Sequence, residues 1–333
     1  PSSAASDVYK RQGNALVDVL ITLDSDMALQ EMQLPKGSMQ LITEEKLSQM
    51  YRKFVTTKTP RATGGSAGNT ILALANLGVT PGFIGKVGRD EMADFFRNNC
   101  IRHGIDARLL ESGLPTGIAS TFISPDGERT FGTYLGAAST LKAEDLSLSM
   151  FVNYSYLYIE GYLVQNHEMI LRAMELGKQA GLQICLDLAS YNIVAEDLEF
   201  IADLIERYVD IVFSNEEEAR AFTGQEPEVA LELISQKCSI AVVKLGAKGA
   251  LIKKGSQVFF INAVKVDNVI DTTGAGDYFS AGFLYGLTIG TSLEKCGKIG
   301  ALLATYIIQV VGTTLSNEKW NEIKLNIDLI LSE

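Results

Sequence analysis

The chain has 333 residues, of which 47% are hydrophobic and 21% charged, so it is long enough to bury a large core without disulfides or metals. Its net charge of -11 argues against nucleic acid as a partner, and the absence of any run of 18 apolar residues argues against a membrane span. The four cysteines lie far apart without metal spacing, which is typical of buried thiols in a reducing compartment, here the cytoplasm: Cys100, Cys185, Cys238 and Cys296.

Residues 1–12, PSSAASDVYKRQ, do not match the alternating pattern of the rest of the chain. We interpret them as a non-native segment left by cloning or sequence assembly and exclude them from the fold. The stretch GNALVDVLITL, from residue 13, is then expected to begin part-way along the first strand. Residues 13–333 are expected to form a single domain.

Short apolar runs alternate with helical patterns along most of the chain. Strands are expected at 155–160, 182–188, 209–214 and 240–245, with helices at 167–180, 196–208 and 216–223. This alternation predicts a doubly wound α/β fold with a mainly parallel sheet flanked by helices.

Two segments break the alternation, because residues 15–60 and 105–135 contain strand-like runs without crossover helices. The second segment includes a turn, Pro-Asp-Gly-Glu at 125–128, between two apolar runs. We expect these segments to form a small separate sheet, a lid over the larger one. Arg129 follows the turn, and either a surface ion pair or a contact with substrate or phosphate is open to it.

The string DTTGAGDYFSAGF, residues 271–283, joins a glycine-rich turn to an apolar helix. The backbone of Gly274, Ala275 and Gly276 is nearly bare, so their amides can converge on an anion, and the helix dipole adds to the attraction. Asp277 opposes an anionic ligand unless its carboxylate takes a proton from an attacking hydroxyl. The alternative is that Asp277 is an ordinary helix N-cap.

A second glycine-rich turn occurs in TGGSAGNTILALANLG, residues 63–78. Gly64 and Gly65 would let backbone approach a small polar ligand, with Asn69 as a hydrogen-bonding arm one turn into the helix. The spacing is not that of a P-loop. A plain strand-to-helix turn, with Asn69 bonded to backbone, is the alternative.

Two further motifs come after predicted strands. Asn215 and Glu218 lie three residues apart on one face of a starting helix, where their oxygens could hold magnesium-bound water; a solvated acidic helix start is the alternative. In KLGAKGA, residues 244–250, Gly246 and Gly249 provide bare backbone over which a nucleotide could lie, although the stretch also fits the entry to a hairpin at 248–261.

Taken together, these motifs resemble those of the ribokinase-like, or PfkB-type, family of carbohydrate and nucleoside kinases. The family's Asp-Thr-x-Gly-Ala-Gly-Asp signature is complete at residues 271–277, and its Asn-x-x-Glu motif is present at 215–218. Its N-terminal signature corresponds to Gly64, Gly65, Asn69, Gly85, Gly88 and Asp90. The match spans nearly the whole chain.

The resemblance implies a kinase domain over 13–333 with ATP as donor, a hydroxymethyl group as acceptor and Asp277 as the base. The amides of 274–277 would hold charge on the transferring phosphate, and residues from Lys244 to Gly249 would line the nucleotide. Asn215 and Glu218 would order Mg²⁺ and its waters, Glu218 through a water. A monovalent cation, K⁺ in this family, would lie near Asp271 and Thr273.

Within the family, three features resemble the adenosine kinase branch: the start GNALVDVL, the turn GGSAGNT and the stretch Ser-Met-Gln-Leu at 38–41. By that resemblance Asp18 would bind ribose hydroxyls, Asn14 would support the sugar or its loop, and Gln40 would lie near the base. The leading hypothesis is therefore phosphorylation of a nucleoside 5′-hydroxyl, most readily that of adenosine, by a monomer or homodimer.

Departures from the family pattern leave the acceptor open, because Asp187 stands where many relatives have asparagine and Lys244 where many have threonine. The alternative acceptor is ribose, fructose or a related sugar. A non-catalytic binding protein of the same fold is a second class of hypothesis. A dinucleotide-dependent oxidoreductase is disfavoured, because no G-x-G-x-x-G comes after the first strand.

Overall fold

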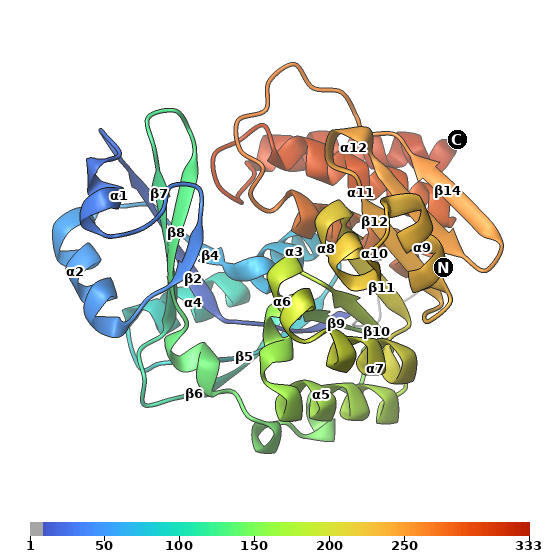
Figure 1. Ribbon diagram of the computed structural model, residues 1–333, viewed down its shortest axis with the longest axis horizontal. Coiled ribbons are helices and arrows are strands. Elements are labelled where there is room, and N and C mark those ends of the chain that lie inside the picture. The colour runs from blue at the N-terminus through green and yellow to red at the C-terminus, as the bar shows by residue number, and fades with distance from the viewer. Residues whose placement is uncertain (1–8) are drawn as a thin grey trace.

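The computed structural model describes residues 9–333, and its large sheet has nine strands in the order β14-β13-β12-β11-β10-β9-β1-β5-β6 (Figure 1). The strands are parallel from β12 through β6, and the hairpin of β13 and β14 adds two antiparallel strands at one edge. Their bounds are β1 (Tyr9–Gln12), β5 (Pro81–Val87), β6 (Asp106–Glu111), β9 (Tyr156–Glu160), β10 (Gln183–Asp187), β11 (Ile211–Asn215), β12 (Ile240–Lys244), β13 (Ala250–Lys254) and β14 (Gln257–Ile261).

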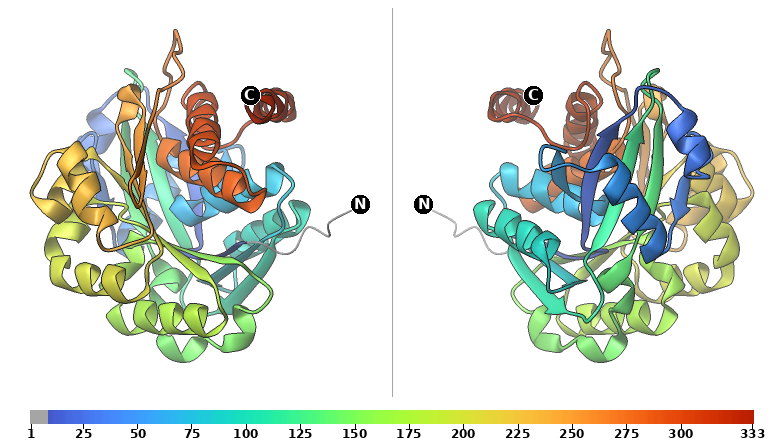
Figure 2. Two further views of the ribbon diagram at one scale, coloured as in Figure 1. Left: turned by 90° about the vertical axis from the view of Figure 1, so that its right-hand side faces the viewer. Right: turned by 90° about the vertical axis from the view of Figure 1, so that its left-hand side faces the viewer.

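Helices cover both faces of this sheet, because successive strand residues point to opposite sides and both sides are apolar (Figure 2). On β9, for example, Leu157 and Ile159 join one core cluster and Tyr158 the other. The first cluster is closed by α5 (His167–Gln179), α6 (Tyr191–Glu196), α7 (Leu198–Tyr208), α8 (Glu216–Thr223) and α9 (Pro227–Ser235). The second is closed by α3 (Gly65–Asn76), α10 (Ala275–Thr288), α11 (Leu293–Ile307) and α12 (Asn317–Ser332). The doubly wound, mainly parallel prediction is confirmed.

A separate five-stranded sheet forms the lid, in the order β3-β8-β7-β2-β4, and lies to one side of the large sheet in Figure 1. Its strands are β2 (Leu16–Thr22), β3 (Met39–Leu41), β4 (Arg61–Gly64), β7 (Gly117–Ile123) and β8 (Arg129–Tyr134). A third core cluster joins the lid to the large sheet through α3, α4 (Glu91–Arg102) and β5.

The predicted lid segments need three corrections. β6 lies within 105–135 but belongs to the large sheet, where it pairs with β5. β4 lies in the lid sheet although it starts after residue 60. Residues 15–60 also carry α1 (Met27–Glu31) and α2 (Glu44–Phe54), whose buried Leu47 and Met50 cover the lid strands. An amphipathic helix inside a strand-rich segment was missed.

The exclusion of residues 1–12 is wrong for its last four. Residues 9–12 form β1, which pairs in parallel with β9 on one side and β5 on the other. Main-chain hydrogen bonds do not depend on side-chain identity, so an atypical sequence can occupy a central strand. The chain then leaves the large sheet at Gly13 and enters the lid at β2, so residues 13–22 do not continue the first strand. Residues 1–8 lie outside the described residues.

The four cysteines are free thiols. Within residues 9–333 no helix is long and apolar enough to cross a membrane.

Candidate active site

Asp277 lies in the first turn of α10, where two side chains from α3 hold its carboxylate. The Ser66 hydroxyl donates to Oδ1 at 2.5 Å, and the Asn69 amide donates to Oδ2 at 2.8 Å. The Thr70 hydroxyl also donates to the Asp277 backbone carbonyl at 3.0 Å. The helix N-cap is Gly274 and not Asp277, so the interpretation of Asp277 as an ordinary cap is wrong.

The turn before α10 has the bare backbone that the sequence predicts. Gly274 has φ +77°, and a Cβ there would lie 3.0 Å from the Thr313 side chain, so glycine is required. The amide of Ala275 donates to the Thr272 carbonyl at 3.2 Å, a bond that an anion would have to replace. The amides of Gly274 and Gly276, with the helix dipole, are therefore the main candidates for the predicted anion hole.

The start of α3 brings a second carboxylate to the site. A Cβ on Gly64 would come within 1.9 Å of the Asp18 Oδ1 atom, so Asp18, on β2 of the lid, packs directly on this glycine. Gly65 has φ +76°, and a Cβ there would lie 3.0 Å from the Asn14 carbonyl oxygen. Gly65 is thus required by its backbone conformation, while a side chain at position 64 would displace Asp18. The two glycines bring the Asp18 carboxylate to the start of α3, the helix whose Ser66 and Asn69 hydrogen-bond to Asp277.

Burial raises the pKa of Asp18 to about 7, and the negative charge of Asp277 adds to that shift. A hydrogen bond from the Gly65 amide and the positive charge of Arg129 oppose it. Near neutral pH this carboxyl group exists in both protonation states, so it can accept or donate hydrogen bonds to hydroxyl groups.

Asn69 has a dual character. Its amide nitrogen holds Asp277, while its Oδ1 is buried without a hydrogen-bond partner among the described residues. An unsatisfied buried acceptor is costly, which favours a ligand hydroxyl at this position. Ser66 was missed in the sequence, although it lies three residues before Asn69 and therefore on the same helical face.

A buried cation lies beside the anion hole. The Lys244 ammonium group would be 3.3 Å from a Cβ on Gly276, and it forms an ion pair with Asp187 at 3.0 Å. Asp187 also accepts hydrogen bonds from Tyr158, at 2.7 Å, and Ser280, at 3.3 Å. Burial works against ionisation of Asp187, but Lys244, the Tyr158 hydroxyl and the Ala189 amide hold its pKa below the ordinary value. The two residues that depart from the family pattern are therefore partners of each other.

Asn215 and Glu218 form a capping box on α8, with three mutual hydrogen bonds of 2.8 Å. Burial raises the pKa of Glu218 to about 7; Lys244 opposes that shift and Asp187 adds to it. Each carboxylate oxygen of Glu218 accepts one hydrogen from Asn215 and retains a lone pair. The arrangement fits an outer position around hydrated magnesium, and the capping function is present at the same time.

The remaining predicted positions are dispersed. Gly246, with φ +56°, faces open space, whereas a Cβ on Gly249 would lie 1.9 Å from the Ile261 carbonyl oxygen, so the hairpin itself requires Gly249. The Asn14 backbone amide donates to Glu160 at 2.8 Å inside the core. Gln40 lies exposed on the lid's edge strand β3, opposite Gly132.

Arg129, on β8 of the lid, forms a buried ion pair with Asp271 at 2.7 Å, with side chains 8% and 5% exposed. The expectation of a surface ion pair is therefore wrong. Asp271 Oδ1 accepts the Thr273 amide at 3.0 Å, and Oδ2 accepts the Gly312 amide at 2.9 Å.

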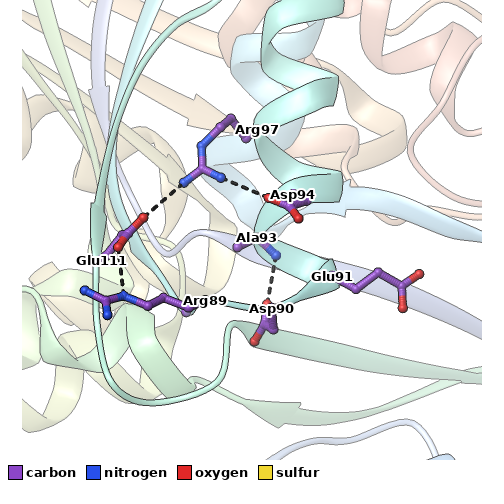
Figure 3. Close-up of a pocket in the computed structure, with 8 residues that line it drawn as sticks. Arg89, Asp90, Glu91, Ala93, Asp94, Arg97 and Glu111 are labelled. Atoms are coloured by element: carbon purple, nitrogen blue, oxygen red, sulfur yellow. Dashed lines mark hydrogen bonds and ion pairs between the residues drawn. The ribbon is translucent and has the colours of Figure 1, made fainter.

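A hollow of about 610 Å³ lies between the start of α4 and β6, and neither Asp18 nor Asp277 is among its lining residues (Figure 3). Its arginines are already paired, Arg89 with Glu111 at 2.9 Å and Arg97 with Asp94 at 3.1 Å. Asp90 caps α4 and accepts the Thr116 amide at 2.7 Å, so it fastens the end of β5 to the start of the lid strand β7. This part of the N-terminal signature is structural.

These features agree with the comparisons to known proteins. The family description "pfkB family carbohydrate kinase" matches residues 42–320, which is most of the chain. The chain belongs to this family. It is therefore a phosphotransferase that acts on a hydroxyl group of a sugar or nucleoside.

Individual relatives differ in the acceptor that their names give. A probable sugar kinase from Rhizobium etli has a TM-score of 0.87 at 34% identity, covering 97% of this chain and 99% of that one. Adenosine kinase from Sinorhizobium meliloti has a TM-score of 0.87 at 32% identity, covering 97% and 100%. A 5-dehydro-2-deoxygluconokinase from Geobacillus thermodenitrificans is 27% identical, covering 74% of this chain and 78% of its own length.

Proposed function

We propose that this pfkB kinase transfers the terminal phosphoryl group of ATP to the 5′-hydroxyl of a nucleoside, adenosine first among them. The observation that carries the proposal is the Asp277 carboxylate, held by Ser66 at 2.5 Å and Asn69 at 2.8 Å at the start of a glycine-preceded helix. Two donors that fix both oxygens preorganise a general base for one direction of proton abstraction.

In this mechanism Asp277 removes the proton of the acceptor hydroxyl while the hydroxyl oxygen attacks the terminal phosphorus of ATP. The bond from that phosphorus to the bridging oxygen breaks, and the nucleoside diphosphate departs. Negative charge on the transferring group would be met by the amides of Gly274 and Gly276, by the dipole of α10 and by the Lys244 ammonium group.

Magnesium would be held through water by Glu218, oriented by Asn215, beside Lys244. When bound, the ion supplies positive charge that neutralises the phosphate oxygens. Glu218 is buried and interacts electrostatically with Lys244 and Asp187, so its role would be to order water at the edge of the phosphate site.

The nucleoside preference rests on the lid. Asp18 would bind a vicinal diol of ribose, a task suited to a carboxyl group whose pKa lies near 7. Asn14 would support the loop beneath the sugar, the free Oδ1 of Asn69 would accept a sugar hydroxyl, and Gln40 would close over the base from the lid edge. Similarity over nearly the full length to an adenosine kinase supports this assignment.

A sugar acceptor is the second candidate, favoured by equal structural similarity to a probable sugar kinase. An acceptor screen separates the two. Purified protein with ATP and Mg²⁺ is assayed against adenosine, inosine, guanosine, ribose, fructose and 5-dehydro-2-deoxygluconate. Turnover of adenosine well above that of every sugar supports the proposal, whereas turnover of sugars alone rejects it in favour of the second candidate.

Asp277→Asn tests the mechanism itself. We expect kcat to fall at least ~100-fold while the binding of nucleotide and acceptor changes little, because the amide cannot accept the proton. Asp203→Asn, the same chemical change at an exposed ion pair on α7, is the matched control and should retain activity. Near-normal kcat in Asp277→Asn would reject this residue as the base.

A further inference from the structure

The Asp271 carboxylate, at the first residue of the glycine-rich signature, is held by two backbone amides and one guanidinium. Oδ1 accepts the Thr273 amide at 3.0 Å, while Oδ2 accepts the Gly312 amide at 2.9 Å and pairs with the Arg129 guanidinium at 2.7 Å. The side chains of Arg129 and Asp271 are almost fully buried, so water does little to stabilise the charge of the Asp271 carboxylate. Within the described residues, the guanidinium is the cation that neutralises this carboxylate.

A monovalent cation at the same place would need a shell of oxygen atoms with the Asp271 carboxylate among them. Three carbonyls of this region already accept hydrogen bonds. The Ile308 carbonyl accepts the amides of Ile270 at 2.8 Å and Asp271 at 3.2 Å. The Thr272 carbonyl accepts the Ala275 amide at 3.2 Å, and the Thr313 carbonyl accepts the Tyr278 hydroxyl at 2.9 Å. While the Arg129 guanidinium is paired with the Asp271 carboxylate, the residues at Asp271 and Thr273 do not fit the K⁺ ion that the sequence resemblance implied, because a second cation there would be repelled by the first.

We propose that the Arg129 guanidinium is a built-in replacement for the monovalent cation of this site, so that the kinase works without K⁺. The inference rests on the proposed function, because it concerns what stabilises the loop of that active site. An arginine side chain stays protonated throughout the physiological range and offers several donors to a carboxylate, which makes it a permanent countercharge.

The origin of this charge gives it a second effect. Arg129 is on β8 of the lid, whereas Asp271 leads into the turn at Gly274. A free cation could neutralise Asp271 in any position of the lid, but a guanidinium can do so only when β8 lies against the loop. Arg129 is therefore a positioning residue that ties the shape of the glycine-rich turn to the lid.

The test compares potassium chloride with tetramethylammonium chloride at equal ionic strength, because the organic cation is too large for an ion site. For the natural protein we expect the phosphorylation rate and the unfolding temperature in the absence of ligands to be the same in both salts, within about twofold and about 1 °C. A greater rise with K⁺ in either measurement would overturn the proposal. This comparison needs no variant.

Arg129→Met removes the charge and the donors but retains an unbranched side chain. We expect its rate in tetramethylammonium chloride to fall at least ~10-fold, because a buried carboxylate loses its partner, and K⁺ to restore activity at least ~3-fold. Arg129→Lys, which keeps one charge, should lose less and respond less to K⁺. A fall that K⁺ does not relieve would show a structural role only and would contradict the proposal.

Failure of the proposed function would look different. If no nucleoside or sugar is phosphorylated in either salt, the kinase assignment fails. The unfolding temperatures still decide the cation proposal, because K⁺ should stabilise Arg129→Met, by at least ~2 °C, and not the natural protein.

Discussion

Replacing Asp18 by asparagine should make the protein more stable while it weakens acceptor binding. Burial and the Asp277 charge raise the pKa of Asp18 from 3.8 to about 7, so the folded state holds a proton that the unfolded state has lost. A pKa rise of this size corresponds to a free energy of ~4 kcal/mol. Because the side chain keeps some exposure to water, we expect about half of that, ~2 kcal/mol. Asparagine retains an acceptor for the Gly65 amide.

Proton linkage sets the sign of the effect. Well below pH 3.8, the ordinary pKa of the group, the carboxyl is protonated in both states, and the variant should match the natural protein. Between pH 4 and 7 only the unfolded state of the natural protein gives up its proton, so its stability falls relative to that of Asp18→Asn and then stays lower above pH 7.

Urea unfolding of both proteins at pH 5, 6, 7 and 8 measures this difference, and acceptor KM gives the functional loss. A difference that does not change with pH would refute the assignment of a raised pKa. A variant less stable than the natural protein at pH 8 would refute the electrostatic argument altogether.

Two other substitutions test the packing of the site. Lys244→Met leaves Asp187 buried without its cation and should destabilise the fold by ~3 kcal/mol in urea unfolding. The double variant Lys244→Thr with Asp187→Asn should recover most of that loss. No recovery would mean that Lys244 and Asp187 do not act as a pair. Gly64→Ala should displace Asp18 and raise acceptor KM at least ~10-fold, whereas Gly113→Ala, with no atom within 4 Å of its added methyl, should be silent. Equal KM in both alanine variants would contradict the contact.

Much of the architecture could be predicted because it depends on local patterns. The alternation of apolar strands and amphipathic helices between 155 and 245 predicts a parallel sheet, and the structure confirms it. β1 could not be found in this way, because residues 9–12 take part through backbone pairing with strands more than 70 residues away. Local sequence patterns carry no information about such contacts.

The candidate site divides along the same line. Gly64, Gly274 and Asp277 stand out in the sequence because glycine-rich turns before apolar helices are visible locally. The partners that decide their chemistry are not visible, since Ser66 reaches across 211 positions to Asp277 and Arg129 reaches Asp271 from a different sheet. The ion pair of Lys244 with Asp187 joins two residues that the sequence shows only as separate departures.

The position of β1 has a consequence for how the protein is made. Tyr9 pairs with Pro81 and with Tyr156, so this interior strand of the large sheet is synthesised long before its second neighbour, β9. At about 5–20 residues per second, translation of the intervening stretch takes roughly 7–30 seconds. During that interval β1 cannot pair with both of its neighbouring strands. The pairing is complete only after the chain beyond residue 160 has emerged from the ribosome.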